Sequence, residues 1–131
     1  TTNNEIMQLR KNIVAGNWKM NKTAVEAAAL INEINQGASG LQNVQLVLCT
    51  PAIYLESARK NAHETISIGA QNCYCEIAGA FTGEISAAML SSVGVSHVII
   101  GHSERLKFFP KNQNCFLKNT HLLLRRAVRN S

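Results

Sequence analysis

The hydrophobic residues of this chain gather in short runs that alternate with amphipathic stretches. Residues 12–18 form the first nearly continuous apolar run, which is typical of a parallel strand whose outer face is covered by helices. Thr23 and Glu26 then form a capping-box pattern, and apolar residues recur at helical spacing as far as the breaker Gly37. The pattern therefore predicts a strand followed by a helix.

The same step from strand to helix is repeated along the chain. Further strands are predicted at 44–49, 66–72 and 96–101. After the second strand, Thr50 is placed to cap a helix and Pro51 suits its first position. A long connection at 73–84 precedes a short helix at 86–93, which Gly94 can end. Strands and helices at this interval predict parallel βαβ units with right-handed crossovers, an α/β fold.

Length and composition are those of an ordinary globular domain. The chain has 131 residues, of which 46% are hydrophobic and 16% charged, so one domain with one core is expected. A membrane span needs about 18 consecutive apolar residues, and neither such a run nor a signal-peptide core is present. No membrane association is therefore expected.

The net charge of +5 is concentrated at one end of the chain. Residues 1–104 carry six Lys or Arg against eight Glu, whereas residues 105–131 carry seven Lys or Arg and no acid. Such a tail could bind polyanions, but it has few interleaved aromatic residues and no nucleic-acid motif, so a nucleic-acid partner is not expected. Leucines after Pro110 are compatible with a helix, and no fifth strand is predicted.

The cysteines do not have the spacing of a metal site. They are Cys49, Cys73, Cys75 and Cys115. One residue separates the middle pair and no second pair follows, so we expect reduced thiols in a cytosolic protein, with no metal.

Polar side chains follow the first and fourth predicted strands. Asn17 and Lys19 come two residues apart where the first strand ends, so both leave the same face, and His102 follows the fourth strand. Lysine offers a cation to an acidic group, and asparagine offers amide donors. Alone, such residues are more often solvated surface groups than a site.

Four motifs in order make the site interpretation specific. They are AGNWKMN at 15–21, AQNCY at 70–74, GAFTGEIS at 79–86 and VIIGHSER at 98–105. Together they resemble the triosephosphate isomerase family over residues 10–105. The resemblance implies an eight-stranded (β/α) barrel of about 250 residues, of which residues 7–105 would supply the first four βα units. Residues 106–131 are then a divergent basic tail, and residues 1–6 are extra N-terminal sequence.

The resemblance also implies a reaction and its residues. The family is an isomerase, an intramolecular oxidoreductase of glycolysis and gluconeogenesis, that interconverts dihydroxyacetone phosphate and glyceraldehyde 3-phosphate through an enediol. His102 matches a neutral imidazole that polarises the substrate carbonyl. Lys19 matches the cation that binds substrate and stabilises negative charge, Asn17 a neighbouring donor, and Glu104 a second carboxylate. No cofactor or metal is implied, and a cytoplasmic location is expected.

The family forms homodimers through the connection after the third strand. Phe81 and Thr82 match the loop that enters the second subunit, and Gln71 and Asn72 match residues near that contact. The family's catalytic base would fall beyond Ser131, so the isolated chain is expected to be inactive. Truncation and a reading-frame slip near Phe109 are two explanations for the missing half of the barrel. The alternative is a non-catalytic module that associates with an intact isomerase subunit.

Overall fold

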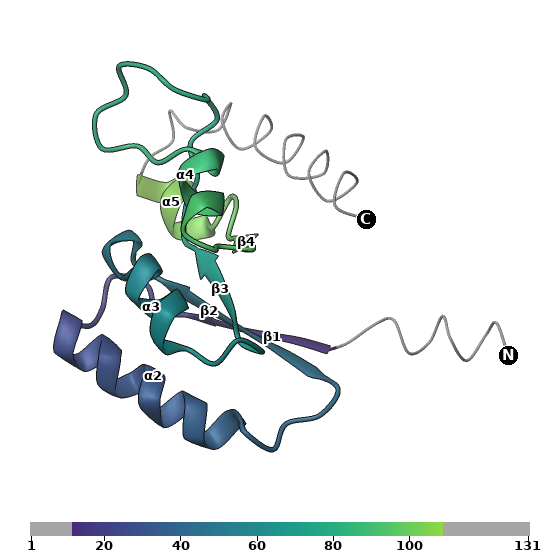
Figure 1. The fold of residues 1–131 in the computed structure, drawn as a ribbon. Helices are drawn as coiled ribbons and strands as arrows, with labels where there is room; N and C mark the ends of the chain where they lie inside the picture. Colours follow the sequence, from purple (N-terminus) through teal and green to yellow (C-terminus); the bar gives the residue numbers. More distant parts are fainter. Residues whose placement is uncertain (1–11, 109–131) are drawn as a thin grey trace, which may run out of the picture.

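The computed structural model describes residues 12–108, which form a parallel four-stranded sheet flanked by helices (Figure 1). The strands are β1 (Asn12–Asn17), β2 (Val44–Thr50), β3 (Ser67–Ala70) and β4 (His97–Val98). Their order in the sheet is β1-β2-β3-β4, and every neighbouring pair is parallel. The predicted α/β fold, with the first four βα units of a barrel, is confirmed.

Helix α2 (Ala24–Ala38) begins where the capping box predicts. The Glu26 carboxylate accepts hydrogen bonds from the Thr23 backbone N–H at 3.2 Å and from the Thr23 hydroxyl at 2.8 Å. The hydroxyl bond is the largest of the causes that lower the pKa of Glu26. The helix runs through the predicted breaker Gly37, because glycine weakens a helix without removing its N–H donor.

The connection after β2 differs from the prediction. Pro51 is extended, with ψ of 149°, and precedes a 3₁₀ turn, η1 (Ala52–Tyr54); helix α3 (Leu55–Asn61) starts only after that turn. The Thr50 hydroxyl donates to the Pro51 carbonyl at 3.1 Å, so it does not cap a helix. The 3₁₀ turn also presents Tyr54, whose hydroxyl donates to the Lys22 carbonyl at 2.7 Å and ties α3 to the loop after β1.

The last two strands are shorter than predicted, because regular pairing stops where the chain turns away from the sheet. One further backbone bond, from Ile99 N–H to the Ala70 carbonyl at 2.8 Å, continues past β4. Helix α4 (Ala87–Ser92) is capped by the Ser86 hydroxyl, and Gly94, with φ of +84°, follows its end as expected. Helix α5 (Ser103–Phe108) closes the described region. The remaining tail and residues 1–6 lie outside the described residues.

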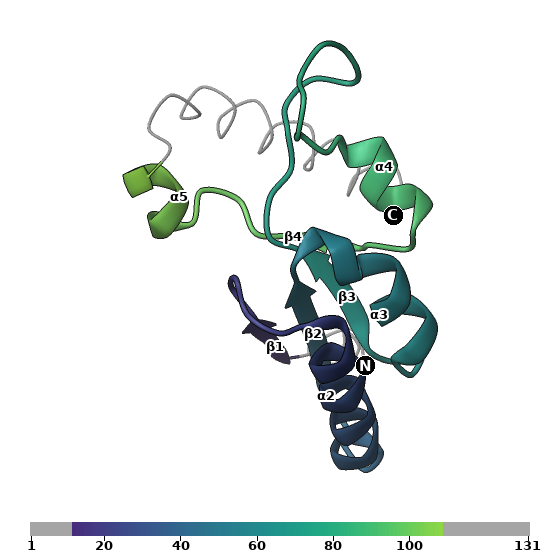
Figure 2. The same ribbon diagram turned by 90° about the vertical axis from the view of Figure 1, so that its left-hand side faces the viewer.

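The core lies between the sheet and the helices on one of its faces. Figure 2 shows α2 and α3 on one side of the sheet, whereas α5 lies beyond the ends of the strands. Ile31, Leu48, Leu55, Ile68 and Leu90 are buried in one cluster on the side of α2 and α3. Burying each such side chain contributes about 1.5–3 kcal/mol, so this cluster is what holds α2 and α3 against the sheet.

The opposite face of the sheet requires a glycine in β3. A Cβ atom at Gly69 would lie 2.7 Å from the Cys49 Sγ and 3.2 Å from a Val47 methyl carbon. Register places Asn17 beside Cys49 on this face. Strand alternation therefore places Ile13 and its neighbour Val14 on opposite faces of the sheet.

Two cysteines match the expectation of reduced thiols and one does not. Cys49 and Cys73 are buried and lie outside any disulfide; the Cys73 Sγ donates to the Tyr74 carbonyl at 3.5 Å, and burial raises the pKa of the Cys49 thiol. Cys75 is disulfide-bonded, so the prediction of a reduced thiol is wrong there. Its side chain lies in the connection after β3, where sequence spacing alone says nothing of pairing. Cys115 lies outside the described residues.

Candidate functional site

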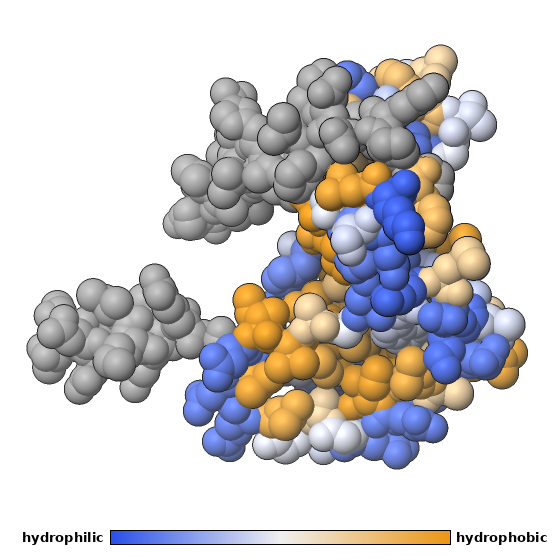
Figure 3. Space-filling model, turned by 180° about the vertical axis from the view of Figure 1, so that it is seen from behind, coloured by the Kyte–Doolittle hydropathy of each residue, from blue (hydrophilic) through white to orange (hydrophobic). Residues whose placement is uncertain are grey.

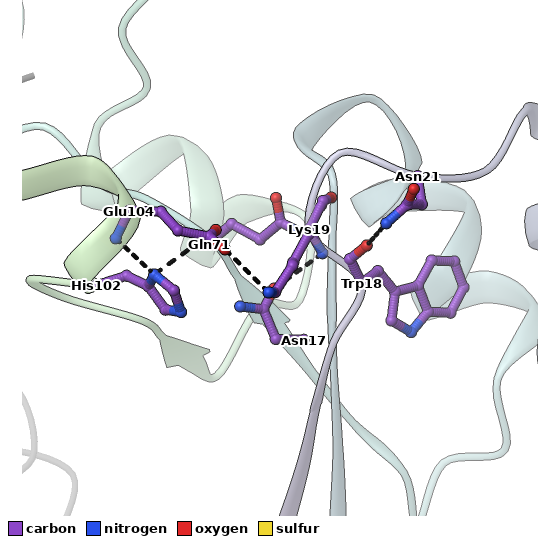
Figure 4. Close-up of polar contacts among 7 residues, drawn as sticks. All are labelled: Asn17, Trp18, Lys19, Asn21, Gln71, His102 and Glu104. Carbon is purple, nitrogen blue, oxygen red and sulfur yellow. Dashed lines mark hydrogen bonds and ion pairs between the residues drawn. The ribbon is translucent and has the colours of Figure 1, made fainter. Parts of the chain in front are cut away.

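The polar residues singled out by the sequence meet at the carboxyl-terminal edge of the sheet (Figure 4). Asn17 ends β1, Lys19 follows in the next loop, and His102 stands at the start of α5. Parallel strands present their carboxyl ends at one edge, so residues far apart in sequence converge there. The structure thus brings together the groups that the motifs predicted.

An ion pair joins the loop after β1 to helix α5. The Lys19 Nζ lies 2.9 Å from the Glu104 Oε1, with both side chains about half exposed. The hydrogen bond from Lys19 is the largest cause of a lowered pKa for Glu104, and the charge of Lys19 adds to it. Because water screens exposed pairs, this one fixes geometry more than it stabilises the fold.

His102 is oriented by the backbone that follows it. Its Nδ1 accepts a hydrogen bond from the Glu104 N–H at 3.1 Å, whereas the Glu104 Oε2 lies 3.7 Å from the same nitrogen. An Nδ1 that accepts a hydrogen bond carries no proton, so the neutral ring bears its hydrogen on Nε2. This tautomer leaves Nε2–H as the ring's donor.

Asn17 shapes the loop that carries Lys19. The Asn17 Oδ1 accepts a hydrogen bond from the Lys19 N–H at 2.9 Å, and Lys19 adopts a left-handed backbone with φ of +56°. Two residues on, the Asn21 amide donates to the Trp18 carbonyl at 2.9 Å and completes the turn. The oxygen end of Asn17 therefore holds the loop, and its amide nitrogen is the donor end.

Gln71 belongs to this edge of the sheet, a placement that sequence reasoning missed. Its Nε2 donates to the carbonyls of Lys19 at 2.8 Å and Cys49 at 3.1 Å. Its position directly after β3 is the signal in the sequence, because Asn17 likewise stands where a strand ends. Its neighbour Asn72 lines a pocket of about 220 Å³ together with Arg105.

Phe81 and Thr82 lie apart from this cluster, in the 73–84 connection that projects beyond the sheet in Figures 1 and 2. The base of the connection is closed by a hydrogen bond from Tyr74 N–H to the Ile85 carbonyl at 2.8 Å. The Phe81 and Tyr74 ring centroids lie 4.7 Å apart. The connection is thus a folded projection, and Thr82 is exposed on it.

Residues 12–108 contain no cluster of three or more His, Cys, Asp or Glu side chains that could hold a metal ion. Within the same range, every helix is too short or too polar to cross a membrane.

We expect Glu104 to titrate below its ordinary pKa of 4.5 while Lys19 is present. A lowered folded-state pKa means that the ion pair is intact above pH 4.5 and is lost as the pH falls through the folded value. Replacing Lys19 by Met should raise the pKa, measured from the Glu104 carboxyl carbon resonance. Lys22→Met, which removes a cation from the same loop but not one that lowers the pKa of Glu104, is the control. Equal midpoints in the native and Lys19→Met chains would contradict the ion pair.

The fold is that of the first half of a parallel (β/α) barrel, and the polar residues lie at the carboxyl ends of its strands. The family model for triosephosphate isomerase matches residues 12–129, beyond the Arg105 at which the motifs end. The chain belongs to the triosephosphate isomerase family, as its motifs predicted.

Curated relatives agree with this assignment. The triosephosphate isomerase of Cytophaga hutchinsonii is 52% identical over 103 residues, which are 77% of this chain and 41% of that protein. The Streptococcus mutans enzyme is 44% identical over 120 residues, 91% of this chain and 48% of that protein. The Bacteroides fragilis enzyme is 48% identical over 103 residues, 77% of this chain and 41% of that protein. The chain therefore spans less than half the length of these relatives.

Proposed function

We propose that this chain supplies the first half of a site that interconverts dihydroxyacetone phosphate and glyceraldehyde 3-phosphate by proton transfer through an enediolate. The observation that carries the proposal is the 2.9 Å contact between Lys19 and Glu104 beside His102. Through this contact a cation from the start of the described region lies beside a carboxylate and an imidazole from its end, at the carboxyl-terminal edge of the sheet. The substrate is a small phosphorylated triose, and the proposal needs no cofactor.

Each side chain has a role that follows from its chemistry. The Lys19 ammonium attracts the substrate phosphate and stabilises the negative charge that forms on the enediolate oxygen. The His102 Nε2–H donates to the carbonyl oxygen and so acidifies the neighbouring carbon. The Asn17 amide nitrogen adds a donor. Glu104, already bound to Lys19, holds that cation in place and is not the base that removes the proton.

We further propose a cytoplasmic homodimer that acts in glycolysis and gluconeogenesis. In it, Phe81 and Thr82 would contact the second subunit, and Gln71 and Asn72 would lie near the same interface. The projection of the 73–84 connection from the sheet supports this arrangement, because an exposed folded loop can enter a neighbouring subunit without rearranging the core.

The function is tested by assembling the chain with a separately produced polypeptide that carries the later βα units of the Cytophaga hutchinsonii relative. In a coupled isomerase assay, His102→Ala should lower turnover of the assembly roughly 10²- to 10⁴-fold, the usual contribution of proton-transfer groups. His63→Ala is the matched control, because this exposed histidine bonds to Thr65 at 2.9 Å, before β3 and away from the site. Equal loss in both variants, or none in either, would contradict the roles assigned here.

A second candidate is a non-catalytic interaction module that joins an intact isomerase subunit. It is favoured by apolar side chains on the projecting connection, where Ile77 is 83% exposed and Phe81 is 39% exposed. The module should co-purify with a full-length isomerase, and Thr82→Ala should weaken the association while Ser91→Ala, an exposed change on α4, leaves it intact. Separate elution of the two proteins at micromolar concentration on size exclusion would count against this candidate.

A further inference from the structure

The backbone of Lys19 has a conformation that needs support from its surroundings. Its φ of +56° lies in the left-handed region, which residues with a long side chain seldom adopt. Such conformations persist when neighbouring groups hold them in place. Two side chains hold the two sides of this residue: Asn17 accepts from its N–H, and Gln71 donates to its carbonyl.

The Gln71 side chain is suited to this contact by its chemistry. One amide nitrogen carries two hydrogens, and two backbone carbonyls, those of Lys19 and Cys49, lie 2.8 Å and 3.1 Å from it. The reversed amide would set its oxygen against two other oxygens, so the orientation follows from the contacts. The Cys49 carbonyl also accepts from Trp18 N–H at 3.0 Å. Gln71, at the end of β3, thus ties the loop after β1 to the end of β2.

We propose that Gln71 is a positioning residue for Lys19, whose backbone it fixes so that the ammonium group reaches Glu104 beside His102. This inference rests on the proposed function, because it concerns the same cation. It assigns Gln71 a role within its own subunit in addition to the subunit contact expected from the family. Through this contact the end of β3 controls the position of a charge that β1 and its loop carry.

The proposal is tested by competitive acetylation of the 131-residue chain with acetic anhydride, followed by peptide mass spectrometry. The quantity measured is the acetylation rate of Lys19 relative to that of Lys60, an internal reference that pairs with Glu56. Gln71→Met removes both donors at similar size, and Gln71→Glu replaces the donors with oxygens at the same shape. Both variants should raise the relative rate of Lys19 roughly two- to fivefold, the range expected for loss of an exposed ion pair.

Two further variants provide a reference value and a control. Glu104→Gln removes the partner of Lys19 and sets the rate expected when the ion pair is lost. Gln45→Met is the matched control, because the Gln45 Nε2 donates to the Ser67 hydroxyl at 2.9 Å, so it also joins β2 to β3 but at the other end of the pairing. Gln45→Met should leave the relative rate of Lys19 unchanged.

Three outcomes would overturn the inference: no change in either Gln71 variant, an equal rise in Gln45→Met, or no rise in Glu104→Gln. The first outcome would mean that Gln71 is not needed to position Lys19. The second would mean that any loosening of the sheet has the same effect, and the third would mean that the ion pair does not limit acetylation of Lys19. The coupled assay tests the proposed function separately. If the assembly is inactive but the Gln71 variants still raise the relative acetylation rate of Lys19, the proposed function fails and the positioning role of Gln71 is retained.

Discussion

A polypeptide of these 131 residues, assayed alone, is expected to isomerise triose phosphates roughly 10²- to 10⁴-fold more slowly than a complete relative, the contribution that a general base usually makes. Lys19 and His102 can polarise the substrate, but a base must still remove a proton from carbon. Among the described residues, Glu104 is the carboxylate nearest to this chemistry. Its bond to Lys19 lowers its pKa and weakens it as a base.

A coupled assay with purified chain measures this difference, and the complete Cytophaga hutchinsonii enzyme provides the reference rate. His102→Ala in the isolated chain should leave the residual rate almost unchanged, because the electrophile has little effect where no base acts. Turnover comparable to that of the complete enzyme, abolished by His102→Ala, would show that the chain holds a functioning base. Such a result would reassign the role of Glu104 or direct attention to residues beyond 108.

The second expected result is self-association of the same polypeptide. Among residues 12–108, β1 pairs with β2 alone, and its side chains Ile13 and Val14 are 59% and 54% exposed. Figure 3 shows apolar side chains spread over the side of the molecule opposite to that of Figure 1. An exposed strand edge with apolar side chains recruits further strands, from a second copy or from an aggregate.

Analytical ultracentrifugation over a range of concentrations measures this association, with denaturant melting of the same samples. Ile13→Lys should shift the distribution strongly toward the monomer, because a charge on an edge strand opposes strand addition. Val25→Lys is the matched control, since Val25 is also exposed, at 81%, but on helix α2. A monodisperse native monomer that unfolds cooperatively would contradict the prediction.

The order of most elements and the family could be predicted from the sequence. Nearly continuous apolar runs marked the strands, and Thr23 with Glu26 marked the start of α2, because these signals depend on residues close together in the chain. Asn17, Lys19 and His102 could be named as candidate site residues because each follows or ends a predicted strand, and parallel strands share one edge. The order of the motifs then identified the triosephosphate isomerase family.

Features that depend on contacts between distant segments could not be predicted in this way. Pro51 precedes a 3₁₀ turn instead of opening a helix, and only in the folded chain does Tyr54 from that turn reach the Lys22 carbonyl. Gln71 reaches the Lys19 carbonyl across 52 positions of sequence. No local pattern encodes such a hydrogen bond, because it exists only when the ends of β1, β2 and β3 are side by side. Sequence therefore supplied the chemical groups of the site, and packing of the strand ends set which of them touch.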